Sequence, residues 1–214
     1  MNKESTKKIT KNDIIFQILD WSSYNGDDND DDDVSPYQIN LYGTTSDGKT
    51  IYVKVEDFTP YFYVKIPSWV KNNDANHLIN NLKTKVNKKF KDSLVRWEIV
   101  DRQSFDKFTN YKIFNFIRLV FRDHRGFRAY SNVINRYKFK SMKGKNINLQ
   151  LFESNIEPFL RFMHIRNLEA CGWVKLPKSF YSYFPEGCNP SNNDINVSIS
   201  WNKIVKVDDS KISS

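Results

Sequence analysis

Between residues 61 and 152, two hydrophobic periodicities alternate in an order that few folds can satisfy. Stretches typical of strands flank two amphipathic segments, in which apolar side chains recur every three or four residues along one face. The order along the chain is strand, helix, strand, strand, helix, strand. The expected strands are 61–66, 94–100, 113–121 and 148–152, and the expected helices are 74–90 and 127–137.

This order predicts a βαββαβ unit of the ferredoxin-like or RRM-like kind. The flanking sequence predicts further strands at 14–21, 37–42, 50–55 and 195–207, and a helix at 156–165. The first of these strands alternates imperfectly and is therefore expected to be buried on both faces. Asp47-Gly48 predicts a hairpin turn, because such a turn needs a positive φ that Asp-Gly tolerates. The predicted fold class is α+β, with the βαββαβ unit inserted in a small antiparallel β-domain, of which an open barrel is one form.

The domain organisation follows from these elements. A chain of 214 residues suits one large domain or two small ones. Residues 1–12 are polar and are expected to form a disordered tail. Residues 13–59 and 148–207 are assigned to the β-rich domain and the segment that leads out of it. Residues 60–152 are assigned to the βαββαβ unit.

Charge favours a polyanionic partner. The net charge is +8 and the isoelectric point about 9.3, although six Asp residues gather between Asp27 and Asp33. Excess positive charge attracts nucleic acid first. The alternative is that an AT-rich genome makes many proteins rich in Lys and Asn, whatever their function.

The sequence predicts no metal site and no catalytic residue. The Asp run lacks the Gly and the terminal Glu of an EF-hand loop, so it is interpreted as a solvated loop. The three His residues are far apart, and the two Cys residues, Cys171 and Cys188, form no zinc motif. Two lone thiols, no signal peptide and no apolar stretch of spanning length predict an intracellular protein without a membrane contact.

One face of the βαββαβ sheet is a candidate for nucleic-acid binding. If Phe62 and Ile117 face the helices, Tyr63, Phe116 and Arg118 face away from them. Such rings can stack on bases while cations neutralise phosphate. Packing of the rings against the neighbouring β-domain is the alternative. Further cations that can converge near the end of that strand and the start of the second helix are Arg122, Arg125 and Arg128, whereas the lysines of the first helix are interpreted as a solvated polar face.

The segment from Leu151 to Trp173 reads LFESNIEPFLRFMHIRNLEACGW. Its Glu-Ser-Asn-Ile, Leu-Arg-Phe-Met and Gly-Trp elements resemble a run that family B DNA polymerases of the delta-like kind carry before their proofreading domain. The sequence is also similar to that family in its opening strand, in the Asp47-Gly48 turn and in the Pro60-Tyr-Phe-Tyr strand. The continuation after Met163 resembles polymerases of large DNA viruses of the mimivirus kind.

This resemblance implies the non-catalytic N-terminal part of a DNA-directed DNA polymerase, a nucleotidyltransferase with a 3′–5′ exonuclease, acting in DNA replication. It implies that residues after about 173 lead into an exonuclease domain, and that the region packs on that domain and guides the template strand. The implied partners are single-stranded template, primer-template DNA and the remaining polymerase domains. Mg²⁺ would serve the full polymerase rather than this chain. The implied location is a viral replication site in the host cell or the nucleus.

The carboxylate motifs of the family's active sites are missing from the sequence. The exonuclease Asp-Ile-Glu and the polymerase Tyr-Gly-Asp-Thr-Asp do not occur, and the nearest triplet is Asp194-Ile195-Asn196. Two other functions are also compatible with the sequence. One is a free-standing RRM-like nucleic-acid-binding module, and the other is a processivity or assembly subunit that binds protein only.

Overall fold

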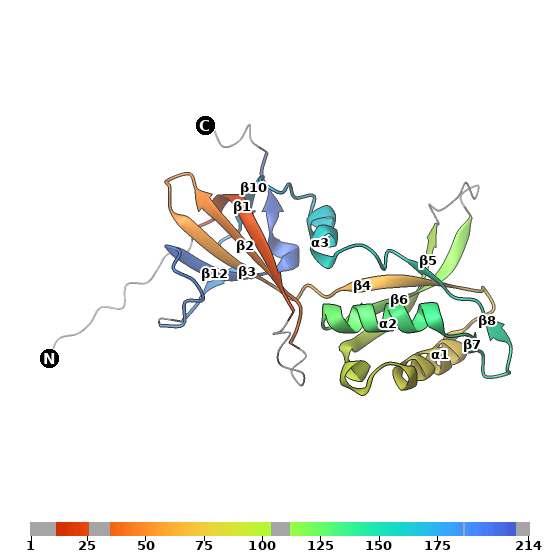
Figure 1. The fold of residues 1–214 in the computed structure, drawn as a ribbon. Coiled ribbons are helices and arrows are strands. Elements are labelled where there is room, and N and C mark those ends of the chain that lie inside the picture. Colours follow the sequence, from red (N-terminus) through yellow and green to blue (C-terminus); the bar gives the residue numbers. More distant parts are fainter. Residues whose placement is uncertain (1–11, 26–34, 104–111, 186, 209–214) are drawn as a thin grey trace. The chain divides into compact units, whose positions relative to one another are not determined.

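The computed structural model describes residues 12–25, 35–103, 112–185 and 187–208 (Figure 1). The Asp run and most of the predicted N-terminal tail lie outside these residues. The chain divides into two compact units. Unit 1 holds the described residues in 12–23, 38–58 and 162–208, and unit 2 holds those in 24–37 and 59–161. No helix in the described part of the chain is both long and apolar enough to cross a membrane.

Unit 2 contains a four-stranded antiparallel sheet in the order β5-β6-β4-β9. Figure 1 shows both of its α-helices on one face of this sheet. The chain order of strands and helices in the sheet is β-α-β-β-α-β, as the periodicities predict. The elements are β4 (Tyr61–Ile66), α1 (Asn72–Lys85), η1 (Lys88–Ser93), β5 (Leu94–Gln103), β6 (Ile113–Phe121), α2 (His124–Arg136), the short pair β7 (Phe139–Lys140) and β8 (Asn146–Ile147), and β9 (Gln150–Phe152).

The core of unit 2 lies between this sheet and the helices. Phe62 and Ile117 point inward from neighbouring strands and are almost fully buried, together with Leu78 of α1 and Phe127 and Tyr130 of α2. Because side chains alternate along a strand, the intervening residues point to the outer face. The predicted inward and outward sets of β4 and β6 are therefore confirmed.

The single helix predicted over 74–90 is wrong at its C-terminal end. α1 ends at Lys85, and Val86 has an extended backbone. The side chain of Asn87 accepts a hydrogen bond from the backbone N–H of Lys89 at 3.1 Å and caps the separate helix η1. An Asn side chain that bonds a nearby backbone N–H competes with a continuing helix, while Val86 stays in the core.

Unit 1 is built on a seven-stranded sheet in the order β11-β12-β3-β2-β1-β10-β13. The prediction of an antiparallel sheet is wrong at one pair, because β12 runs parallel to β3, with Ile195 opposite Ile51. The predicted strand 195–207 is broken by η2, and two short strands lie in 171–184, where none was predicted. The elements are β1 (Ile14–Tyr24), β2 (Gln38–Thr45), β3 (Thr50–Glu56), α3 (Pro158–Arg166), which joins unit 2 to unit 1, β10 (Trp173–Leu176), β11 (Tyr181–Tyr183), β12 (Ile195–Ser200), η2 (Trp201–Lys203) and β13 (Val205–Lys206).

Strand β1 is buried on one face only, which contradicts the expectation for 14–21. Phe16 and Ile18 are fully buried, whereas Leu19 is 57% exposed. Gly43 of β2 lies so close to β1 that an added Cβ would stand 2.1 Å from the carbonyl oxygen of Gln17 and 2.6 Å from the ring of Phe16. The close approach of these strands therefore requires glycine at this position.

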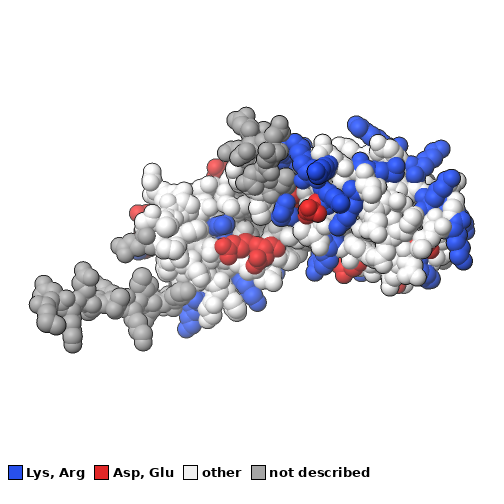
Figure 2. Space-filling view, turned by 90° about the horizontal axis from the view of Figure 1, so that it is seen from below, with Lys and Arg blue, Asp and Glu red and all other residues white. Residues whose placement is uncertain are grey.

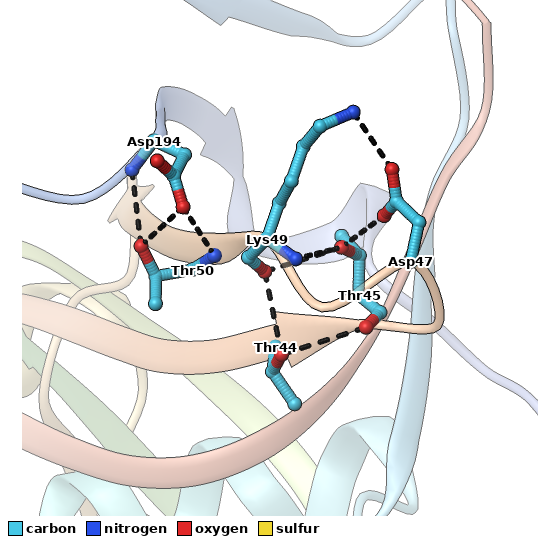
Figure 3. A network of polar contacts seen from close by, with 6 residues as sticks. All are labelled: Thr44, Thr45, Asp47, Lys49, Thr50 and Asp194. Carbon is cyan, nitrogen blue, oxygen red and sulfur yellow. Dashed lines mark hydrogen bonds and ion pairs between the residues drawn. The ribbon is translucent and has the colours of Figure 1, made fainter.

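The β2–β3 hairpin turns at Asp47-Gly48 as predicted, with Gly48 at φ 83°. Figure 3 shows the polar network that surrounds this turn. The Asp47 carboxylate accepts from the Thr45 hydroxyl at 2.5 Å and pairs with Lys49 at 2.7 Å. The Asp194 carboxylate accepts from both the backbone N–H and the hydroxyl of Thr50, each at 2.8 Å, so the segment before β12 is tied to the start of β3.

Candidate nucleic-acid interface

Four aromatic rings lie together on the outer face of the unit 2 sheet. Phe116 meets Phe152 edge to face at 5.2 Å between ring centroids, and Tyr63 at 6.3 Å. Tyr63 in turn meets Tyr61 at 5.7 Å. Phe116 is only 3% exposed, whereas Tyr63 is half-buried, and burial raises the pKa of its phenol. Of the two predicted stacking rings, Tyr63 alone keeps surface that a base could reach.

Two arginine side chains lie over the Tyr61 ring. The guanidinium carbons of Arg118 and Arg161 are each 4.3 Å from its centroid, which is cation–π distance. Arg118 also donates to Glu98 at 3.1 Å. Arg161 is buried and pairs with the Glu153 carboxylate, and it donates to the Glu153 carbonyl at 3.0 Å. Arg118, predicted as a phosphate contact, thus already has a carboxylate and a ring as partners.

A small pocket of about 120 Å³ opens beside these rings. Four of its lining residues were not predicted from the sequence, because the alternation of side chains along β4 and β6 gives no information about β5 and β9. The register places Phe152 of β9 directly opposite Tyr63 and Arg102 of β5 opposite Phe114, and only this pairing brings them together. The lining residues are Tyr63, Arg102, Gln103, Phe116, Phe152 and Glu153.

The turn from β6 into α2 is rigidly built. The Asp123 side chain caps α2 by accepting from the backbone N–H of Gly126 at 2.5 Å, as an N-cap carboxylate does. A Cβ on Gly126 would lie 2.1 Å from the Cβ of the buried Ser93, so the helix start and η1 are in close contact. The backbone N–H of Arg122 donates to the Ser93 carbonyl at 2.8 Å.

This turn presents three of the four predicted arginines. Arg122 and Arg125 are half-buried, and the Arg125 guanidinium lies 5.8 Å from the Phe90 ring centroid. The Arg128 side chain is 68% exposed, with its Nη2 3.7 Å from Glu157. The predicted residues therefore occupy two places: Tyr63, Phe116 and Arg118 on the outer sheet face, and Arg122, Arg125 and Arg128 at the β6–α2 turn.

His124 is buried beside these arginines. Its Nε2 accepts from the Nε of Arg128 at 3.2 Å, and its Nδ1 lies 3.4 Å from a Glu157 oxygen. Its backbone N–H donates to the side chain of Asn25 at 2.8 Å. Burial lowers the pKa of His124, and the Arg128 charge lowers it further, against the opposing effects of Glu157 and Asp123. The neutral imidazole is therefore the form that this site favours.

Unit 2 should lose stability as the pH falls from about 7 to about 5. The folded-state pKa of His124 lies below the unfolded value of about 6.5, so the unfolded state binds the proton first and the free energy of unfolding falls below that pH. His124→Gln should remove this part of the pH dependence in urea unfolding at pH 7, 6 and 5. The exposed His164→Gln is the matched control, and an unchanged pH dependence in His124→Gln would contradict the assignment.

The described residues contain no group of three or more His, Cys, Asp or Glu side chains that could hold a metal ion. Asp194, the residue nearest in sequence pattern to an exonuclease carboxylate, instead accepts hydrogen bonds from Thr50 at the start of β3. Its hydrogen bonds from Thr50 lower its pKa. The Asp run lies outside the described part of the chain.

Comparison with known proteins gives consistent matches across nearly the whole chain. No family model matches. A DNA polymerase of Acanthamoeba polyphaga mimivirus is 36% identical over 94% of this chain and 12% of its own length. The DNA polymerase delta catalytic subunit of Schizosaccharomyces pombe is 26% identical over 92% of this chain and 17% of its own length.

Solved structures agree on the fold. The family B DNA polymerase of the archaeon Pyrobaculum calidifontis matches with a TM-score of 0.63 over 92% of this chain and 21% of that chain, at 14% identity. The chain thus spans less than a fifth of the length of the curated relatives named above. Its sequence and its α+β fold together show that it belongs to the family B DNA polymerases, as one region of such a protein.

Proposed function

We propose that this chain is the non-catalytic N-terminal part of a family B DNA-directed DNA polymerase with a 3′–5′ exonuclease, acting in DNA replication. The observation that carries the proposal is the similarity to the mimivirus DNA polymerase over 94% of this chain. In this role the βαββαβ unit helps to guide the template strand, and the β-rich part leads into and packs on the exonuclease domain. Mg²⁺ belongs to the active sites of the whole enzyme, which works where the viral genome is replicated, in the host cell or its nucleus.

The proposed DNA contact is mainly with phosphate. Phe116 is covered by Phe152 and Tyr63 and offers little face to a base. Arg128 is well exposed. Arg122 and Arg125 precede it at the start of α2, where the Asp123 side chain caps the helix. Contacts to phosphate position a nucleic acid without reading its sequence, which suits a region that must accept any template.

Arg128→Gln should weaken binding of single-stranded DNA more than Arg118→Gln. The Arg118 side chain is only 27% exposed and is hydrogen-bonded to Glu98 at 3.1 Å, whereas the Arg128 side chain is 68% exposed and its ion pair with Glu157 is longer, at 3.7 Å. Fluorescence anisotropy with a labelled oligonucleotide between about 50 and 200 mM salt measures this. Removing one phosphate contact should reduce the slope of log affinity against log salt by about 0.7 for a single strand.

Lys178→Gln in unit 1 is the control for a change in net charge. Equal slopes for Arg128→Gln and the wild-type chain would contradict the arginine assignment. Reading the gene beyond this region tests the larger proposal: an Asp-Ile-Glu strand within some tens of codons supports the polymerase. A stop codon without that motif would favour a free-standing nucleic-acid-binding module.

A further inference from the structure

Positive charge is concentrated in the helical layer of unit 2, which comprises α1, η1, α2 and the segment through Lys145. Residues 72–93 and 124–145 contain twelve Lys and Arg but only two carboxylates, Asp74 and Asp92. Their net charge of +10 exceeds the +8 of the whole chain. The remainder of the sequence is therefore net acidic, and the basic character of the protein resides in these 44 residues.

The fold joins the two basic segments into one surface. The Lys85 ammonium lies 4.6 Å from the Tyr137 ring centroid, and the Tyr130 hydroxyl donates to the Lys91 carbonyl at 2.9 Å. At the other end, the Asp74 side chain accepts from the backbone N–H of Met142 at 3.2 Å. Segments that the sequence separates by about 30 residues thus lie side by side.

Most of these cations reach solvent. Figure 2 shows Lys and Arg side chains spread over the face of unit 2 that carries the helices. The inner faces of α1 and α2 are apolar and pack on the sheet, so the charges are left on the side away from the outer aromatic face. The exposed members beyond the arginine turn are Lys85, Lys88, Lys89, Lys91, Arg136, Lys138, Lys140, Lys143 and Lys145.

Three aromatic rings in or beside this layer each have one of its cations near the ring, although Tyr137 remains 47% exposed. Lys85 lies over Tyr137, Arg125 lies over Phe90, and Lys145 lies 4.3 Å from the centroid of Trp69. A single-stranded nucleic acid binds by stacking bases on exposed ring faces, and a cation close to a ring competes with a base for that face. The layer offers distributed positive charge rather than stacking platforms.

We propose that the helical layer of unit 2 binds the phosphate backbone of duplex DNA without reading its sequence. α1 has 14 residues and is about 21 Å long at about 1.5 Å per residue. Its two cations, Lys83 and Lys85, both lie in its last turn, so the positive charge gathers where α1 meets η1 and the C-terminal half of α2. Arg125 and Arg128 belong both to α2 and to the arginine turn. The duplex site is therefore assigned to the other exposed cations of the layer, Arg136 and the lysines, and it adjoins the single-strand site at the turn.

The test replaces three exposed cations of the layer at once, Lys88→Gln, Lys138→Gln and Lys143→Gln. The control replaces three cations of unit 1, Lys54→Gln, Lys178→Gln and Lys203→Gln, and therefore removes the same net charge. Both variants of the 214-residue chain are titrated with a labelled duplex of about 16 base pairs and with one strand of that duplex. Far-ultraviolet circular dichroism and thermal melting show whether each variant is folded.

The helical-layer variant should bind the duplex about tenfold or more weakly near 0.1 M salt, with a log–log salt slope smaller by about 0.9 for each phosphate that is no longer neutralised. Its single-strand affinity should change much less, and the control should stay near the wild-type chain. Equal reductions in the two variants would overturn the inference, because net charge alone would explain them. Undiminished duplex binding, or a larger reduction for the single strand than for the duplex, would also overturn the inference. Neither result would contradict the separate proposal that the arginine turn binds single-stranded DNA.

Discussion

Phe116→Ala is expected to lower the free energy of unfolding of unit 2 by about 3–5 kcal/mol, as Phe-to-Ala changes at buried sites do. Phe116 faces away from the helices yet is only 3% exposed, because Phe152 and Tyr63 pack against it edge to face. Its removal takes away a large apolar area and leaves a gap on the outer sheet face beside Tyr63 of β4 and Phe152 of β9. Urea unfolding followed by circular dichroism measures the loss of stability.

Ile113→Ala is the matched control, since Ile113 lies on the same strand but is 63% exposed. It should change the unfolding midpoint very little. The folded fraction of Phe116→Ala should bind single-stranded DNA as tightly as the wild-type chain does. Unchanged stability together with an affinity loss of about 1–3 kcal/mol would instead identify Phe116 as a base-stacking residue.

Glu153→Ala should destabilise unit 2 by about 3–5 kcal/mol, because it leaves the buried Arg161 guanidinium without its carboxylate. The opposite change, Arg161→Met, should cost less. The Glu153 side chain is 45% exposed, so its charge can be solvated by water, and a Met side chain can fill part of the space over Tyr61. Thermal and urea unfolding of the two variants should therefore rank them in that order.

The double variant Glu153→Ala/Arg161→Met separates the buried charge from the backbone. Glu153 adopts a left-handed conformation with φ 59°, in which any residue other than Gly, Asn or Asp is unfavourable, so the change to Ala can alter only a small backbone contribution. That backbone effect is present in both the single Glu153→Ala variant and the double variant. The double variant should consequently be more stable than Glu153→Ala alone, and a double variant that is less stable would show that the uncompensated charge is not the main cause.

Local pattern was sufficient to predict the order of the main strands and helices of unit 2, because these elements are long enough to show their periodicities. The alternation of β4 and β6 correctly assigned Phe62 and Ile117 to the core. Unit 1 was harder, since β10 and β11 contain only four and three residues and carry too little pattern to recognise. The parallel pairing of β12 with β3 joins residues 144 positions apart, Ile51 and Ile195, and no local signal reports such a pairing.

The candidate site was only partly accessible from the sequence. Alternation predicted that Phe116 and Tyr63 share the outer face, but it could not show that Phe152 covers Phe116, because that contact depends on the register of β9. The helical lysines were interpreted as a solvated face, since one helix considered alone has no neighbour. The contacts of Lys85 with Tyr137 and of Tyr130 with the Lys91 carbonyl reveal that two basic segments form one surface.

The discontinuous construction of unit 1 determines the order in which a ribosome can complete the molecule. Unit 2 lies mostly in one continuous stretch, 59–161, which is synthesised in full before β12. At about 5–20 residues per second, β3 waits roughly 7–30 s for its parallel partner. During that interval the edge of β3 has no strand beside it, and an exposed strand edge can pair with other chains. Translation speed and chaperone access over this interval are therefore expected to govern the yield of correctly assembled protein.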